Sequence, residues 1–169
     1  MEIFRFFRSP LAAGFLLCGA TALRAQPLMS AWLMLNLSSQ ETVLVLDAAE
    51  KDKLQQAGWL TNGRGSLALN PAADLVGVHR LVISNAAGND RVFTVSAEEM
   101  AAGLKAGYHE EGVLGQAAAT QLKPEMIPVY RFSRTQKHLW LIGTTARPWA
   151  EKNGWKFGGI AFWIWPAKP

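Results

Sequence analysis

The sequence predicts a mainly β protein with short inserted helices, built from three pseudo-symmetric repeats of about 48 residues. Three segments align without a gap, beginning at Leu46, Val95 and Ile142, so the period is 49 and then 47 residues. In each segment a Gly-aromatic pair follows the first residue by twelve positions, and a second glycine closes the segment. A period of this size is typical of repeat architectures, in which units bury one another's apolar faces.

The positions that the three units share are two glycines and one aromatic residue in each. They are Gly58, Trp59 and Gly63, then Gly107, Tyr108 and Gly112, then Gly154, Trp155 and Gly159. The first glycine is expected to end a helix in the left-handed conformation, and the second to mark a turn or bulge before a closing strand. An aromatic residue that recurs in every unit is typical of a core position. We therefore interpret these residues as structural.

Each unit is expected to run strand, strand, short helix, strand, with a possible fourth strand around the repeated aromatic residue. β-branched and aromatic residues dominate the predicted strands. The first strands are predicted at 32–37, 78–84 and 129–132, and the second strands at 43–46, 92–95 and 139–142. The last strand, 160–165, is apolar throughout, so we expect it to be buried on both faces or packed beneath a neighbouring unit, and to end at Pro166.

Capping boxes predict where the first two helices begin. In Asp47-x-x-Glu50 and Ser96-x-x-Glu99 the first side chain accepts from an unpaired N–H group, and the glutamate reaches back. The third unit has Pro148 inside the corresponding segment. Its helix is therefore expected to be shorter and to start at or near that proline.

Links that contain proline place the unit boundaries at about 30–74, 75–124 and 125–166. One unit of this size cannot bury its apolar face alone, so the three are expected to close on one another. Threefold closure predicts a β-trefoil-like barrel. An α+β stack of three small sheets is the alternative that the repeat leaves open.

Residues 1–25 have the layout of a secretory signal peptide. Arg5 and Arg8 form a positive head, the segment 9–20 is mostly apolar and uncharged, and small residues follow. An uncleaved membrane anchor is the alternative. The single cysteine, Cys18, lies in this segment, so the predicted mature domain 26–169 has neither a disulfide nor a thiolate zinc site. We expect a secreted or periplasmic bacterial protein.

The charge of the predicted mature domain argues against nucleic-acid binding. Removing residues 1–25 reduces Lys plus Arg from 17 to 14 and Asp plus Glu from 13 to 12, so the net charge falls to +2. The remaining sequence has no Lys/Arg run that could follow a phosphate backbone. Contact with a membrane is expected only through the signal segment, if it stays uncleaved.

Catalytic and metal-binding patterns are weak. His79, His109 and His138 form no HxxxH or HxH pair, so we expect no metal and no cofactor. Glu110 and Glu111 are adjacent on a predicted strand, and their side chains should point to opposite faces rather than flank one glycosidic bond. The sequence has no G-x-S-x-G motif. We therefore expect a protein that is not an enzyme.

Tryptophan is the best indication of a binding site. The chain has seven: Trp32, Trp59, Trp140, Trp149, Trp155, Trp163 and Trp165. Trp149 breaks the repeat, since it aligns with Lys53 and Ala102, and it is therefore the best candidate for an exposed stacking platform. The candidate ligand-binding residues grouped with it are Tyr130, Arg131, Arg134 and His138.

The third unit resembles a repeat of secreted bacterial proteins, in a family described as a domain of unknown function. The family repeat contains, in order, the approximate segments PVYRFYN, HFYT and GWxYEGIAFYV. The residues that match them, in the same order, are 128–132, His138, Gly154-Trp155 and 159–162. The resemblance extends over about residues 30–166. At the HFYT segment the chain has HLWL, so the third unit lacks that tyrosine, together with any function that it carries in the family.

Members of that family usually carry the module beside other secreted domains, often cell-wall or polysaccharide hydrolases, and the resemblance therefore implies an accessory binding role. We expect a recognition module for an envelope glycan. The alternative is a protein-binding envelope factor or an inhibitor of a secreted enzyme, whose partner would be another envelope or secreted protein. A small hydrolase ranks last.

Overall fold

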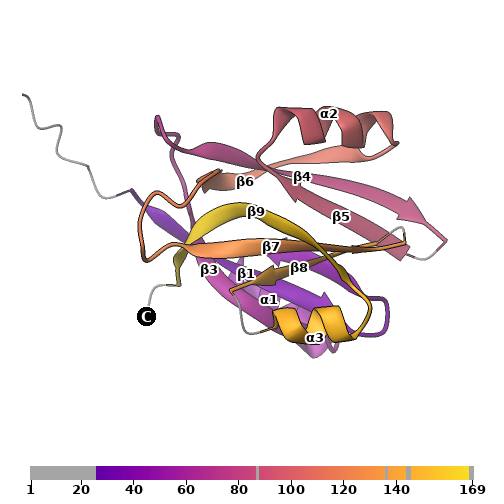
Figure 1. Ribbon diagram of the computed structural model, residues 1–169. Helices are drawn as coiled ribbons and strands as arrows, with labels where there is room; N and C mark the ends of the chain where they lie inside the picture. Colours follow the sequence, from indigo (N-terminus) through magenta and orange to yellow (C-terminus); the bar gives the residue numbers. More distant parts are fainter. Residues whose placement is uncertain (1–25, 87, 136, 144–145, 168–169) are drawn as a thin grey trace, which may run out of the picture.

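The computed structural model describes residues 26–86, 88–135, 137–143 and 146–167, and the predicted signal peptide lies outside them. Each third of the domain runs strand, strand, helix, strand (Figure 1). The first third holds β1 (Leu28–Asn36), β2 (Glu41–Val45), α1 (Ala48–Gln56) and β3 (Leu60–Ala68). The second holds β4 (Val76–Asn85), β5 (Gly88–Thr94), α2 (Ala97–Lys105) and β6 (His109–Ala117). The last holds β7 (Ile127–Arg134), β8 (Lys137–Ile142), α3 (Arg147–Lys152) and β9 (Lys156–Pro166).

The strands form one open antiparallel sheet, which confirms the prediction of a mainly β protein with short helices. In each third the first strand pairs with both of the others, for example β1 with β2 and β3. The third strands join the thirds through short pairings of β3 with β6 and with β9. No trefoil-like closure is seen in the pairing of the described strands. None of the described helices has the length and apolar character needed to cross a membrane.

The core lies where the second strands β2, β5 and β8 contact one another. Trp140 is its largest side chain, and its ring meets that of Phe93 edge to face at 5.1 Å. A smaller cluster in the last third surrounds Phe132 and Trp155, and another in the first third surrounds Met34, against which Trp59 packs. Successive side chains of a strand point to opposite faces, and those that point inward form these clusters.

The first two helices begin at the predicted capping residues. Asp47 Oδ1 accepts a hydrogen bond from the N–H of Glu50 at 2.8 Å, and Ser96 Oγ accepts one from the N–H of Glu99 at 3.2 Å. The side chain of Glu99 does not accept from the N–H of Ser96, as a complete capping box requires, because Glu99 pairs with Arg131. The N–H of Ser96 donates to Oγ1 of Thr94 instead. The third helix, α3, is shorter, has Pro148 in its first turn and has no side-chain cap.

All three helices end in the same way, at a glycine with positive φ. The φ angles are 83° at Gly58, 94° at Gly107 and 79° at Gly154. The next residue then donates its N–H back across the last turn, as in a Schellman motif: Trp59 to Leu54, Tyr108 to Gly103 and Trp155 to Ala150, at 3.0 to 3.1 Å. This bond fixes where each repeated aromatic side chain enters the fold.

The predicted fourth strand is wrong, because the third strand begins directly after the repeated aromatic residue. The second glycines, Gly63, Gly112 and Gly159, lie inside β3, β6 and β9 rather than before them. The pairing register shifts next to each of them, as expected of a β-bulge. A bulge bends and twists a strand without ending it, which explains why one strand continues through the glycine.

The prediction that the last strand is buried on both faces is also wrong. Phe162 and Ile164 of β9 are fully buried, but Ile160 is 44% exposed and Trp163 and Trp165 are half-buried. Successive side chains of a strand point to opposite faces, so an unbroken apolar run does not require two buried faces. Only one face of β9 is turned to the core.

Gly63 lies where β3 approaches the end of β8 most closely. A Cβ atom added at Gly63 would stand 2.6 Å from the Cβ of Ile142. We expect Gly63→Ala to lower the free energy of unfolding by about 1–3 kcal/mol, measured by urea denaturation, because the backbone must shift. Gly58→Ala is the comparison for backbone strain without a steric contact: nothing lies within 4 Å of its Cβ, and its positive φ alone should cost about 1 kcal/mol. An unchanged free energy for Gly63→Ala would show that this approach is not tight.

Candidate functional site

A pocket of about 200 Å³ lies between the first hairpin and the last third of the chain. Its lining residues are Leu35, Leu37, Gln40, Arg134, Leu139, Trp149, Asn153 and Trp155. They come from β1 and the turn after it, from the β7–β8 hairpin, and from α3 and the residues that follow it. Aliphatic and aromatic side chains therefore form most of the wall, and two amides and one guanidinium add polar groups.

Arg134 is held rigidly at the end of β7. Its Nη1 donates to the backbone oxygen of Asn153 at 2.9 Å, and its Nη2 donates to Oε1 of Gln40. The guanidinium lies 4.7 Å from the ring centre of Trp155, within cation–π distance. Gln40 itself has a φ of 59°, which is uncommon for a residue other than glycine. The arginine thus connects both sides of the pocket.

Trp149 gives the pocket an exposed aromatic face. It lies in α3 and is 43% exposed, whereas the next residue, Ala150, is fully buried. Because neighbouring helix positions point about 100° apart, burial of Ala150 turns Trp149 toward solvent. Asn153 Nδ2 donates to the backbone oxygen of Trp149 at 2.8 Å and tightens this short helix.

The structure brings together only two of the five residues grouped in the sequence prediction, Arg134 and Trp149. Tyr130 is 8% exposed in the core, which leaves little of its surface for a ligand. Arg131 forms an ion pair with Glu99 of α2. His138 binds Asp90. These three residues connect parts of the fold and do not line the pocket.

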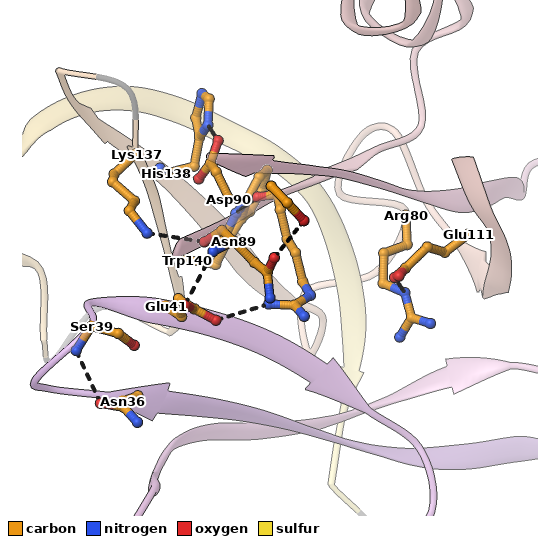
Figure 2. Close-up of polar contacts among 12 residues, drawn as sticks. Asn36, Ser39, Glu41, Arg80, Asn89, Asp90, Glu111, Lys137, His138 and Trp140 are labelled. Carbon is orange, nitrogen blue, oxygen red and sulfur yellow. Dashed lines mark hydrogen bonds and ion pairs between the residues drawn. The ribbon is translucent and has the colours of Figure 1, made fainter. Parts of the chain in front are cut away.

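Asp90 is a buried carboxylate that the sequence did not single out. It is 2% exposed and accepts three hydrogen bonds. Tyr108 Oη donates at 2.5 Å, and the backbone N–H and Nδ1 of His138 each lie at 2.7 Å. Figure 2 shows Asp90 beside His138. Burial acts to raise the pKa of Asp90, but the hydrogen bonds from His138 and Tyr108 outweigh it and hold that pKa below its usual value. The pKa of Tyr108 is raised by its burial and by the neighbouring carboxylate.

A wider polar cluster around Asp90 joins the tips of the three hairpins (Figure 2). Glu41 of β2 accepts from the N–H of Asn89 at 3.1 Å and lies 3.4 Å from Arg91 Nη1. Lys137 Nζ donates to the backbone oxygen of Asn89 at 3.0 Å. These bonds lie between β2, β5 and β8, so the cluster connects the three thirds of the domain.

Glu110 and Glu111 pair with separate residues of β4. Glu110 lies 2.6 Å from Nδ1 of His79, and Glu111 lies 2.7 Å from Nε of Arg80 (Figure 2 shows the second pair). Within the described residues, no group of three or more His, Cys, Asp or Glu side chains is arranged to hold a metal ion.

Comparison with known proteins gives one match. The model of a family described as a domain of unknown function (DUF5648) matches residues 31–165. No curated protein and no solved structure matches the chain.

Proposed function

Since the chain belongs to the family described as a domain of unknown function (DUF5648), whose description assigns no activity, we propose a function from the site alone. The protein is a recognition module that binds a glycan and catalyses no reaction. The signal-peptide layout of residues 1–25, together with the resemblance to secreted bacterial proteins, supports a glycan of the bacterial envelope. The observation that carries this proposal is the pocket in which the exposed ring of Trp149 stands beside Arg134 and two amide side chains.

The chemistry of this pocket suits a sugar. A pyranose ring has an apolar face that packs against an aromatic ring, and hydroxyl groups that need hydrogen-bond partners around its edge. Trp149 supplies the aromatic ring. Hydrogen-bond donors and acceptors for the hydroxyl groups come from Gln40, Asn153 and Arg134. Among the described lining residues there is neither a carboxylate pair nor a nucleophile beside a base, which supports binding without catalysis.

We also propose that the three thirds are repeats that have diverged at this position. They share the order of elements, the glycine at the end of each helix and the bulge in the third strand. Trp149 stands where the aligned positions are Lys53 and Ala102. The aromatic platform is therefore present in the last unit alone, and we propose one binding site rather than three.

The test compares retention of residues 26–169 on insoluble peptidoglycan and on other envelope polysaccharides. Trp149→Ala is expected to weaken retention about tenfold, because the stacking surface is lost. Because Trp149 is 43% exposed, more than half of its surface is covered, and the free energy of unfolding of the variant should also fall by about 1–2 kcal/mol. Circular dichroism must therefore show that the variant is folded. Leu104→Ala is the matched control, an exposed apolar residue of α2, and it should bind like the wild type.

Retention on no polysaccharide would contradict glycan binding. The competing function is that of an envelope factor or enzyme inhibitor that binds protein, and Leu37, 55% exposed at the pocket, is the apolar side chain that such a partner would cover. Capture of one secreted protein by the wild type and not by Trp149→Ala, without polysaccharide retention, would favour that function.

A further inference from the structure

The charge in the pocket is unbalanced. Arg134 is the one ionisable residue among the described residues that line it. Its hydrogen-bond partners are a backbone oxygen and an amide oxygen, and its stacking partner is Trp155, so all three are uncharged. Within the described part of the chain, no carboxylate forms an ion pair with Arg134.

Other arginines of the protein form ion pairs with carboxylates. Four of them pair with a glutamate: Arg80 with Glu111, Arg91 with Glu41, Arg131 with Glu99, and Arg147 with Glu151. Folding thus neutralises these guanidinium groups where they are partly buried. At Arg134 it fixes the guanidinium in place and leaves its charge without a counter-ion.

A guanidinium fixed in this way is suited to bind a carboxylate. It has five N–H donors, of which two are used by Asn153 and Gln40. Stacking on Trp155 and the two hydrogen bonds hold its plane, so little conformational entropy remains to be lost when an anion binds. Hydrogen bonds between a guanidinium and a carboxylate are charge-assisted and about twice as strong as bonds between two neutral groups, and the planar guanidinium can bind both carboxylate oxygens at once, which it cannot do with a single hydroxyl.

We propose that the ligand of this pocket is an acidic saccharide, a sugar unit that carries a carboxylate. The carboxylate binds the free N–H groups of Arg134 while the sugar ring packs on Trp149. This inference rests on the proposed glycan-binding function and adds the class of sugar. A neutral sugar would leave the guanidinium partly desolvated without a counter-ion, which is unfavourable.

The experiment compares each acidic oligosaccharide with its own neutral form. Oligogalacturonate and oligomannuronate are titrated into residues 26–169 in a calorimeter, and then again after chemical reduction of their carboxylates to primary alcohols. At least one acidic form is expected to bind about tenfold more tightly than its reduced form. The difference should shrink as the salt concentration is raised, because salt screens an exposed ion pair.

Variants assign the difference to Arg134. Arg134→Gln should reduce the affinity for the acidic form to that for the reduced form, while Arg134→Lys should retain part of the difference because it keeps the charge without the planar fork. Lys105→Gln is the control, since it removes the same charge from an exposed position at the end of α2. The comparison in the wild type needs no variant, so it stands even where a substitution impairs folding.

The outcomes separate this inference from the function on which it rests. Equal binding of acidic and reduced forms would overturn the acidic ligand and leave glycan binding intact. Retention on an envelope polysaccharide without binding of either acidic oligosaccharide would also overturn it. Failure of every polysaccharide in the retention test would overturn the proposed function itself.

Discussion

Replacing Asp90 with alanine is expected to lower the free energy of unfolding by about 3 kcal/mol. The substitution removes a fully buried acceptor from three donors, the hydroxyl of Tyr108 and the two nitrogens of His138. Leaving such groups unpaired in the interior costs more than the bonds themselves contribute. Loss of this magnitude is a large part of the stability of a domain, which is typically about 5–15 kcal/mol.

Urea denaturation followed by far-ultraviolet circular dichroism measures this effect. Asp90→Asn should cost less than Asp90→Ala, because the amide oxygen still accepts one or two of the three bonds. Asp74→Ala is the control, since Asp74 is exposed and should change the free energy of unfolding by less than about 0.5 kcal/mol. An Asp90→Ala variant as stable as the control would contradict the role of this cluster in holding the thirds of the domain together.

The same carboxylate gives the stability a defined pH dependence. The pKa of Asp90 in the folded protein lies below its usual value, which is about 3.9 in an unfolded chain. The folded state therefore binds fewer protons, so the contribution of Asp90 is fully present above about pH 4 and is lost as the pH falls through the folded pKa. The stability difference between wild type and Asp90→Asn should be smaller at pH 3 than at pH 7.

Local signals in the sequence predicted the order of elements in each third. The capping residues Asp47 and Ser96 and the glycines that end the helices act within one turn of chain, and the structure has them in these roles. The strands were also predictable, because β-branched and aromatic runs mark them. The start of the third strand was wrong, because the second glycine was expected to mark a turn or bulge before that strand, and the structure has it as a bulge inside the strand.

The site was predictable in part, for reasons that follow from chain separation. Trp149 stood out as an exception to the repeat, and Arg134 lay near it in sequence. Gln40, which holds Arg134, is 94 residues away, and no local pattern connects the two. Asp90 was hidden for the same reason: it follows a polar turn, and its partner His138 is 48 residues distant. The packing of one third of the domain against another decides both contacts, because neither pair lies on hydrogen-bonded strands, and the sequence alone does not determine that packing.

Trp140 is the side chain whose loss is expected to be most costly for the core. It is fully buried in β8, its ring meets Phe93, and its Nε1 donates to the backbone oxygen of Arg91 at 2.9 Å. Asn62 Nδ2 donates to the backbone oxygen of Trp140 at 3.3 Å. The ring thus lies where β8 contacts β5, and its removal would leave a cavity between the second and the last third of the domain.

We expect Trp140→Ala to lower the free energy of unfolding by about 3–5 kcal/mol, because the lost burial and the residual cavity add together. Circular dichroism is the appropriate measurement, since the substitution also removes a fluorophore. Trp140→Phe should cost less, because it keeps most of the apolar contact with Phe93 and loses the hydrogen bond to Arg91. At this position the related family pattern has a tyrosine, and the burial of Trp140 favours a packing role for the aromatic ring there. If Trp140→Ala were as stable as the wild type but failed to bind glycan, the position would serve recognition instead.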